Sequence, residues 1–498
     1  MLFVEARFFF FFAIVFCVAW ALRSNTLRKV FLLGCSYFFY ACFFVGNPLV
    51  FLAHLRAGQW SELPPGWWFP FVLLGSTCMD YLVGLKLEDS TDPFRRRCFL
   101  LVSLATNLGT LCVFKYLNFF IGSAQQFLAS IGLETSFHTL RIILPYGVSF
   151  YTFQSISYTI EVYRRHIRAE RRFLDLAFFI GFFPPLVAGP IVRAMHFLPQ
   201  TKTRPRWAEV DVRAALVLFL SGFVKKACVA DGVAPFVDQF FSNPQAYGTA
   251  STWIGVLLYA VQIYCDFSGY TDMAIAVAGL LGYSLTINFN FPYFASSITD
   301  FWRRWHISLS SWLRDYLYIS LGGNRGSTLF TYRNILLTML LGGLWHGASW
   351  VFVLWGGLHG VALIVHRQWA RLSQQLWAGS KQLPDLGRQV YHVGAVLLTF
   401  YFVCFCWIFF RAIDLPKAMT IARSFVFLQN NGPGTLDMRL WWLLGGLAFV
   451  HWLNYKRVFA TWWRRVPTFA FAAGYGAGWA IVLLFTPAQY VPFIYFQF

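Results

Sequence analysis

Two histidines in apolar surroundings are the side chains best suited to chemistry in this sequence. His346 lies in the run LWHGASW and follows an apolar stretch that begins just after Arg333. If Arg333 marks the membrane interface, a helix rising about 1.5 Å per residue places His346 roughly 20 Å into the bilayer, whose hydrocarbon layer is about 30 Å thick. A neutral imidazole there can take a proton from a hydroxyl near pH 7. We therefore predict a catalytic role for His346, and a structural or relay histidine is the alternative.

The second histidine, His306, lies in the segment 299–317, which reads TDFWRRWHISLSSWLRDYL. The spacing of its aromatic and aliphatic residues predicts one amphipathic helix, with Trp305 and His306 on the apolar arc. The opposite arc carries polar and basic residues, among them Arg303, Arg304 and Arg314. We expect this helix at the cytoplasmic interface or in a protein-lined cavity. An ionisable group on the buried side usually has a function or a partner, so a site residue and a structural histidine are both compatible with His306.

Two acids interrupt another apolar segment, at Asp266 and Asp272 in CDFSGYTD. Their spacing of six residues puts them on different faces of a helix, which argues against a pair of carboxylates working together as acid and base. We predict that they cap a helix broken at Gly269, and orientation of a histidine is the alternative. Ser297 and Asp300 are spaced like a capping box at the start of the next helix.

No sequence motif predicts a metal or a bound cofactor. The ten cysteines are mostly scattered in apolar segments without a CxxC spacing, which is typical of small buried hydrophobic side chains. HExxH, P-loop, GxSxG and Rossmann motifs are all missing from the sequence.

The composition is that of a membrane protein. Of the 498 residues, 58% are hydrophobic and 12% are charged, whereas a soluble protein has about 45–50% apolar and about 25% charged residues. This difference argues against a soluble enzyme, a disordered chain and a fibrous repeat. A membrane span needs about 20 apolar residues, and the apolar segments could supply roughly ten spans or more. Near the start of the chain, the basic residues follow the apolar run at 8–22, which predicts a first span with its N-terminus outside.

The net charge of +19 comes from basic clusters between apolar segments. That arrangement is typical of cytoplasmic loops rather than of a nucleic-acid interface. Basic clusters at 164–172 and 193–206 flank the segment 173–192, whose middle reads PPLVAGP. Because proline breaks a helix, and broken backbone in a membrane must be satisfied by protein or water, we predict that this segment is re-entrant. The clusters at 367–388 and 411–423 flank a single span, and both cannot be cytoplasmic.

Several longer stretches resemble the membrane-bound O-acyltransferase family, and within it the bacterial alginate O-acetyltransferase branch. The resemblance covers nearly the whole chain, and the blocks 288–326 and 341–360 are its specific part. The similar stretches are PYGVSFYTFQSISYTIEVYR (145–164), FFPPLVAGPIVR (182–193), DFSGYTDMAIA (266–276), 288–326, 341–360 and FIYFQF (493–498).

The resemblance implies an all-α polytopic membrane protein with about 10–13 transmembrane or re-entrant helices around a central tunnel. It implies a single domain over 1–498, with N-terminal helices at 1–140, a core with re-entrant segments at 141–367 and C-terminal helices at 368–498. His346 matches the family's invariant catalytic histidine, and His306 matches its second polar site residue.

The resemblance also implies a reaction and its partners. The family moves an acyl group from a cytoplasmic thioester such as acetyl-CoA to a hydroxyl, with no bound cofactor. In the alginate branch, acetyl groups pass outward to periplasmic SGNH-type acetyltransferases and the polysaccharide machinery, so we expect a multi-pass protein of the bacterial inner membrane. Donor contacts are expected from Arg303, Arg304 and Arg314, because a basic rim attracts an anionic donor. Trp305 and Asp266 are the other candidate donor contacts.

Two other functions remain open at the sequence level. A related acyltransferase with another cargo or acceptor, such as D-alanine delivered from a carrier protein to teichoic acid, would show the same features. A transporter would use buried His and Asp as a proton path, but the sequence lacks paired broken helices in two matching halves.

Overall fold

The computed structural model describes the chain except for residues 46–47, 60–61, 134, 136–138, 141, 378–383, 430–431, 459–460, 488–490 and 495–498. The described residues are largely helical and contain no β-strand; one isolated parallel bridge joins Tyr247 and Gly434. The chain forms two compact units, 1–215 with 273–286, and 216–272 with 287–498. The prediction of an all-α protein is confirmed.

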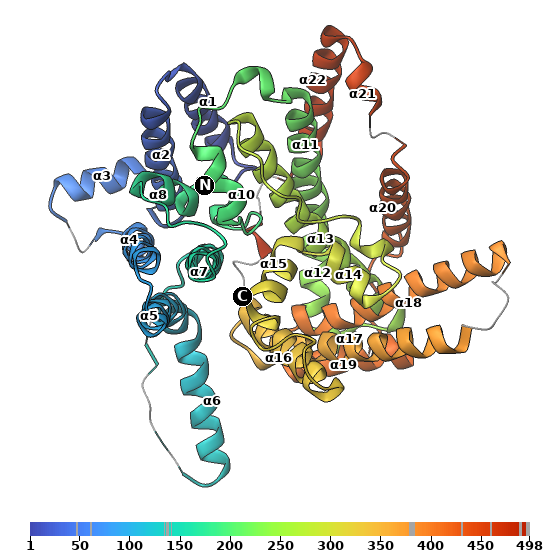
Figure 1. Cartoon of the computed structure of the whole chain (residues 1–498). Coiled ribbons are helices and arrows are strands. Elements are labelled where there is room, and N and C mark those ends of the chain that lie inside the picture. Colours follow the sequence, from blue (N-terminus) through green and yellow to red (C-terminus); the bar gives the residue numbers. More distant parts are fainter. Residues whose placement is uncertain are drawn as a thin grey trace. The chain divides into compact units, whose positions relative to one another are not determined.

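The first unit contains the helices of the N-terminal half (Figure 1). In chain order these are α1 (Ala6–Ala21), α2 (Asn25–Val45), α3 (Pro48–Arg56), α4 (Phe69–Asp89), α5 (Pro93–Leu111), the π-helix η2 (Cys112–Tyr116), α6 (Leu117–Ser130), α7 (Val148–Tyr163), α8 (Phe173–Gly181), α9 (Phe183–Leu186), α10 (Ala194–Thr201) and the 3₁₀-helix η3 (Trp207–Glu209).

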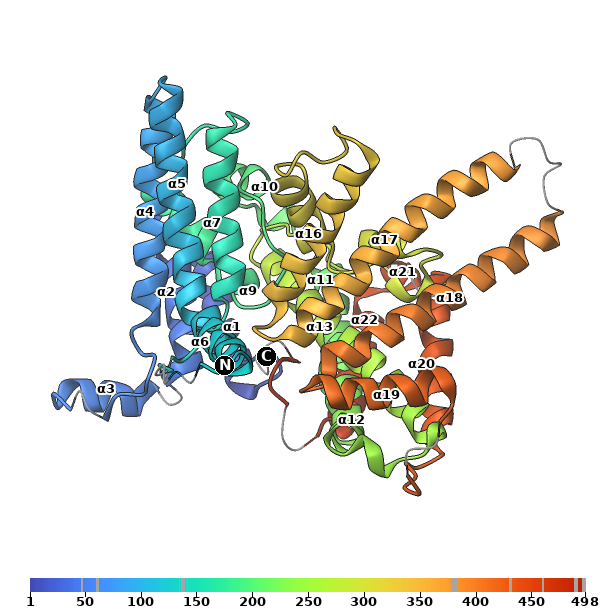
Figure 2. The same ribbon diagram turned by 90° about the horizontal axis from the view of Figure 1, so that it is seen from below.

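Helices α4, α5 and α7 pack side by side as a bundle, which Figure 2 shows along its length. The start of α5 is fixed by Asp92, whose carboxylate accepts hydrogen bonds from the backbone N–H groups of Phe94 and Arg95, as expected for an N-cap residue before proline. Within the bundle, the buried Asp80 carboxylate accepts hydrogen bonds from Ser103 and Asn107. A buried acid is therefore supplied with donors by its neighbouring helix.

The segment 173–192 lies within the first unit and contains a break. Helices α8 and α9 are separated by a break at Phe182, and α10 brings the chain back to Thr201. Lys202, the next residue, forms ion pairs with Glu170 and with Asp175 at the start of α8. The two flanks of the segment therefore meet in one charge network, as a re-entrant segment requires, and its path in the membrane stays a prediction.

The second unit contains the remaining helices. They are α11 (Val212–Phe223), the π-helix η4 (Val224–Ala230), α12 (Asp231–Ser242), η5 (Pro244–Ala246), α13 (Thr249–Leu280), η6 (Pro292–Phe294), α14 (Ile298–Arg304), α15 (Ile307–Trp312), the π-helix η7 (Leu313–Tyr318), α16 (Thr328–His346), α17 (Trp350–Trp377), α18 (Asp385–Arg411), α19 (Leu415–Phe427), α20 (Leu440–Tyr455), α21 (Trp462–Arg465) and α22 (Thr468–Leu484). Helices α11 and α13 each have one part in the first unit and the other part in the second.

Helices α16 and α17 form a tight hairpin. Their backbones approach closely at Gly343, where an added Cβ would lie 2.2 Å from the carbonyl oxygen of Phe352. A side chain at this position cannot be accommodated without moving one helix, which explains the glycine. The hairpin fixes His346 at the C-terminal end of α16.

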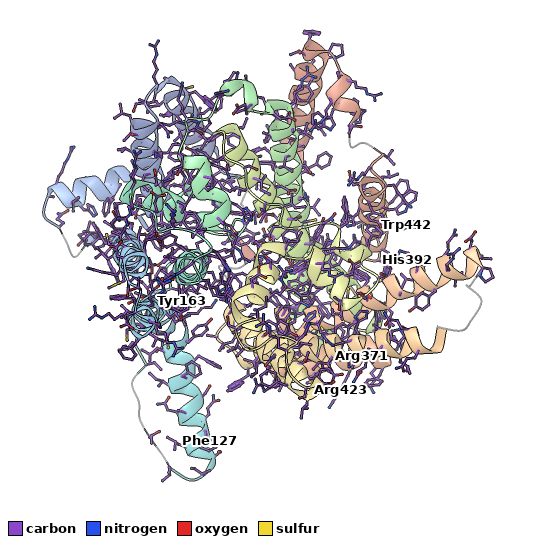
Figure 3. All side chains as sticks on the ribbon, in the orientation of Figure 1. Phe127, Tyr163, Arg371, His392, Arg423 and Trp442 are labelled. Carbon is purple, nitrogen blue, oxygen red and sulfur yellow. The ribbon has the colours of Figure 1, made fainter. Side chains whose placement is uncertain are left out.

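Helices α17 and α18 pack side by side, and Trp369 donates a hydrogen bond to the hydroxyl of Tyr391. Figure 3 labels Arg371 on α17 and His392 on α18. At the other end of α18, the Arg411 guanidinium lies 2.6 Å from the Asp238 carboxylate and its side chain is mostly buried. Arg411 is therefore ion-paired with a carboxylate that is itself exposed. This pairing reduces the net positive charge of one of the two basic clusters that flank α18.

Five helical segments are long and apolar enough to cross a membrane among the residues that the structure describes. They are Asn25–Phe44, Phe69–Asp89, Pro93–Ser130, Trp350–Gln375 and Asp385–Arg411. Two shorter apolar helices, Ala6–Ala21 and Thr468–Leu484, accompany them. Large apolar side chains remain exposed on these helices, for instance Phe127 on α6 (Figure 3), as expected where lipid is the solvent.

Candidate active site

The segment around His306 is not the single helix that its sequence predicts. Helix α14 ends at Arg304, α15 begins at Ile307, and His306 between them has a left-handed backbone with φ of 43°. The neighbouring loop supplies hydrogen bonds that a continuous helix would make itself: the N–H of Ile307 donates to the carbonyl of Asn288, and the carbonyl of Arg304 accepts from Asn290. The prediction of one helix was therefore wrong because tertiary backbone contacts stabilise a break.

Other local predictions in this segment are confirmed. The Ser297 hydroxyl accepts a hydrogen bond from the backbone N–H of Asp300 and caps α14. The Asp300 carboxylate, however, binds Arg304 instead of closing the capping box. Trp305 and His306 are both buried, as their places on the apolar arc predict.

The His306 ring is oriented by Asn288, a residue that sequence reasoning missed. The Asn288 side-chain oxygen lies 3.2 Å from His306 Nδ1 and 3.1 Å from the backbone nitrogen of Ser308, and it also accepts from the Ser308 hydroxyl at 3.0 Å. A backbone N–H can only donate, so the atom facing Ser308 is the oxygen. His306 Nδ1 must then donate to the same oxygen.

This contact fixes the tautomer of His306. With the proton on Nδ1, the lone pair of the neutral ring is on Nε2. Burial lowers the pKa of the His306 imidazole to about 3, so the ring is neutral at physiological pH. A ring that binds a proton so weakly is better suited to accept a hydrogen bond than to store a proton.

His346 is the last residue of α16 and is 3% exposed. Its ring contacts three aromatic side chains: the ring centroids of Trp345, Trp355 and Phe410 lie 5.0, 5.0 and 5.2 Å from its own. Trp355 comes from α17 and Phe410 from α18, so the hairpin and the following helix together form the surroundings of this histidine. His346 is therefore buried inside the protein, and its depth in the bilayer, expected from its distance to Arg333, stays a prediction.

One tryptophan ring brings the two histidines together. The Trp345 centroid lies 5.0 Å from that of His346 and 6.2 Å from that of His306. Two imidazoles 40 positions apart in the sequence thus contact the same indole. This arrangement gives the second unit a buried pair of titratable rings in aromatic surroundings, with one of them held in a defined tautomer.

A third buried histidine, His359, extends this aromatic cluster. It lies on α17 rather than on the helix of His346, because α16 ends before Gly347. Its ring packs against Trp355 and Trp302, with centroids 4.7 and 5.1 Å away. Neither ring nitrogen has a hydrogen-bond partner among the described residues. Within the same described part of the chain, no group of three or more His, Cys, Asp or Glu residues could hold a metal ion.

The three arginines near the site differ in whether they already form an ion pair with a carboxylate. Arg304 is bound to Asp300 through two carboxylate oxygens at 2.9–3.0 Å. Arg314 is exposed and lies 2.7 Å from Asp315, whose hydrogen bond raises the pKa of the guanidinium. Arg303 is exposed and forms no ion pair within the described residues. Of the three, Arg303 is the cation most available to an incoming anion.

Asp266 and Asp272 do not cap a broken helix. Helix α13 continues without interruption from Thr249 to Leu280, so this prediction was wrong. Both carboxylates are instead partners of lysines: Asp266 pairs with Lys226, and Asp272 pairs with Lys225. An ion pair satisfies a buried carboxylate and leaves the helix intact, whereas a cap requires a free helix end.

Comparison with known proteins identifies the family. The profile of MBOAT, the membrane-bound O-acyltransferase family, matches residues 76–408. The chain belongs to this family. It is therefore a multi-pass, all-α membrane O-acyltransferase, and both His346 and His306 lie within the matched region.

Three relatives illustrate the similarity. A probable alginate O-acetylase AlgI of Azotobacter vinelandii is 40% identical over 449 residues, covering 88% of this chain and 80% of the relative. Another of the same name from Pseudomonas aeruginosa is 40% identical over 428 residues, covering 84% and 73%. A peptidoglycan O-acetyltransferase of Helicobacter pylori is 36% identical over 385 residues, covering 72% and 70%.

Proposed function

We propose that this O-acyltransferase takes an acetyl group from a cytoplasmic thioester such as acetyl-CoA and passes it across the bacterial inner membrane for O-acetylation of an exopolysaccharide such as alginate. The observation that carries the proposal is the buried pair His346 and His306, which contact the same Trp345 ring. The names of the relatives in Azotobacter and Pseudomonas support acetate as the cargo and alginate as the polymer.

The two histidines have different roles in this proposal. His346 removes the proton from the acceptor hydroxyl as its oxygen attacks the thioester carbonyl. The new C–O ester bond forms, the C–S bond breaks, and the thiol leaves with a proton. His306, with its lone pair on Nε2, orients a donor or acceptor group by accepting a hydrogen bond. Its left-handed backbone is a strained conformation of the kind that occurs at functional sites.

The acetyl group must then reach a polymer outside the cytoplasm. We propose that periplasmic SGNH-type acetyltransferases receive it, directly or through a carrier, as the resemblance to the alginate branch implies. A peptidoglycan acceptor is the second candidate, and the relative in Helicobacter named for peptidoglycan O-acetylation favours it.

The proposal is tested with purified protein in lipid vesicles and acetyl-CoA labelled in the acetyl group. The wild type is expected to release coenzyme A and transfer label to an acceptor, and a His346→Ala variant is expected to do neither. Alginate and peptidoglycan oligosaccharides, each with a partner transferase, distinguish the two polymers. If a D-alanyl carrier protein is used and acetyl-CoA is not, the proposed cargo is wrong.

Arg303 should bind the anionic part of the donor. We expect Arg303→Gln to raise KM for acetyl-CoA several-fold with little change in kcat, because ground-state binding is lost. The matched variant is Arg304→Gln, which removes a guanidinium already engaged by Asp300 and should raise KM less. The measurement is the salt dependence of KM for both variants, since an exposed charge acts less strongly at high ionic strength. Equal and salt-insensitive KM values for wild type and Arg303→Gln would contradict this role.

A further inference from the structure

A buried ion cluster lies in the second unit, at residues other than the histidines. Lys226 Nζ is 2.7 Å from a carboxylate oxygen of Asp231 and 2.7 Å from one of Asp266. The three side chains are 3%, 2% and 4% exposed. Lys226 lies in the π-helix η4, Asp231 begins α12, and Asp266 lies in α13. Burying three charges is costly unless each has partners, so this cluster requires an explanation.

The cluster also binds a segment that is distant in sequence. Lys226 Nζ donates to the carbonyl oxygen of Val491 at 2.8 Å, and the backbone N–H of Ile494 donates to Asp266 at 2.7 Å. One lysine and one carboxylate thus hold the two ends of the segment 491–494. Charged donors and acceptors form stronger hydrogen bonds than neutral ones, so the ion cluster fixes this segment more firmly than apolar contacts alone.

Helix α13 and η4 approach each other closely near the ion pair of Lys226 with Asp266. An added Cβ at Gly269 would lie 2.6 Å from the carbonyl oxygen of Gly222 and 2.9 Å from the nitrogen of Lys226. The glycine therefore allows η4 to lie close enough for Lys226 to reach Asp266, one turn earlier on α13.

The segment held by the cluster reaches the active site through two aromatic rings. Phe493 is fully buried, and its ring centroid lies 5.6 Å from that of Phe267. Phe267 in turn meets His306 edge to face, with centroids 4.6 Å apart and an interplanar angle of 88°. Phe267 follows Asp266 directly in the sequence. The ion cluster, segment 491–494 and the His306 ring are therefore linked by successive direct contacts.

We propose that Lys226, Asp231 and Asp266 form a latch that fixes segment 491–494, and that the latched Phe493 holds Phe267 against His306. The latch residues and Phe493 are positioning residues for the acyl transfer, and this role rests on the function proposed above. Asn288 holds one edge of the His306 ring through Nδ1, and Phe267 packs against the ring as a second constraint. A ring held by a hydrogen bond and by packing keeps its Nε2 in one direction.

The chain contains a matched control for the latch. Lys225 and Asp272 form a second ion pair between the same two elements, η4 and α13. Among the described residues, the Lys225 ammonium hydrogen-bonds to Asp272 and not to segment 491–494. Lys225→Met therefore removes a neighbouring lysine charge from the same helix without removing the contact to Val491.

The first test measures the segment itself and needs no enzymatic activity. In a variant lacking the native cysteines, Ile494→Cys places a thiol at a buried position while keeping the backbone N–H. We expect slow reaction with a maleimide in this background and in Lys225→Met, and at least tenfold faster reaction when Lys226→Met or Asp266→Ala is added. Equal rates in all four proteins would overturn the latch, whatever the acetyl transfer assay shows.

The second test measures the link to His306. Lys226→Met and Phe493→Ala should each lower kcat about tenfold with KM for acetyl-CoA unchanged, whereas Lys225→Met should not. Phe493→Leu, which keeps an apolar side chain there, should recover part of the loss.

If the latch acts through Phe493, the double variant Lys226→Met/Phe493→Ala should be no slower than either single variant, because the two changes break one chain of contacts. Multiplicative losses would overturn the positioning role. The positioning role would also be overturned if Lys226→Met kept the kcat of the wild type while the thiol introduced at position 494 reacted freely. Equal thermal stability of Lys226→Met and Lys225→Met in detergent is the check that a loss of kcat is local.

Discussion

Replacing His346 with alanine should lower acetyl transfer by about 10²–10⁴-fold, the usual contribution of general-base catalysis. The ring is buried and surrounded by Trp345, Trp355 and Phe410, and none of these three rings carries a basic nitrogen that could replace it. The variant leaves a cavity in an aromatic cluster, but the α16–α17 hairpin is held by close backbone contact at Gly343 and should still form. The measurement is the initial rate of label transfer at equal amounts of folded protein in vesicles.

Two further variants separate catalysis from packing. His359→Phe changes another buried histidine that contacts Trp355, and it should keep most of the activity if this ring only packs. His306→Asn retains a hydrogen-bonding side chain and should keep more activity than His346→Asn. The assignment of roles is wrong if His346→Ala stays active, or if the change at His306 is the more damaging at equal expression.

The sequence was sufficient to predict the class of fold and the burial of both histidines. The reason is that the class of fold follows from composition, and the burial of each histidine from the apolar residues around it, which are local properties. Prolines and flanking basic clusters predicted that segment 173–192 is re-entrant. The ion pairs of Lys202 bring its two flanks together, and its path in the membrane stays a prediction.

The sequence was not sufficient where distant backbone decides local structure. The break at His306 depends on backbone hydrogen bonds with residues 288 and 290, and nothing in the periodicity of 299–317 indicates them. Asp266 was misassigned to a helix cap for a similar reason: its partners Lys226 and Ile494 lie 40 and 228 positions away. A signal that could have found the first partner is the pair of adjacent lysines at 225–226 in an apolar segment, because buried lysines require acidic partners.

Replacing Asn288 should have the second large effect on acetyl transfer. Asn288→Ala should lower transfer about 100-fold, because it removes the oxygen that accepts from His306 Nδ1 and frees the ring to change its tautomer and direction. A misplacement of a site group by about 1 Å can cost about 10²-fold in rate. Ser308→Ala is the matched variant, since it removes only one of the donors to that oxygen and keeps the backbone N–H, so its loss should be much smaller.

Asn288→Asp distinguishes orientation from simple packing. Its carboxylate can accept from the same donors and should therefore restore much of the activity lost in Asn288→Ala. Its negative charge next to Nδ1 stabilises the imidazolium form, so it should raise the pKa of His306 above the value of about 3 that burial sets. As pH falls toward that raised pKa, His306 Nε2 becomes protonated and can no longer accept a hydrogen bond. The pH–rate profile of Asn288→Asp should therefore lose activity on the acidic side at a higher pH than wild type, with the profile at alkaline pH unchanged. A profile identical to wild type, together with full activity of Asn288→Ala, would show that Asn288 does not orient His306 for the reaction.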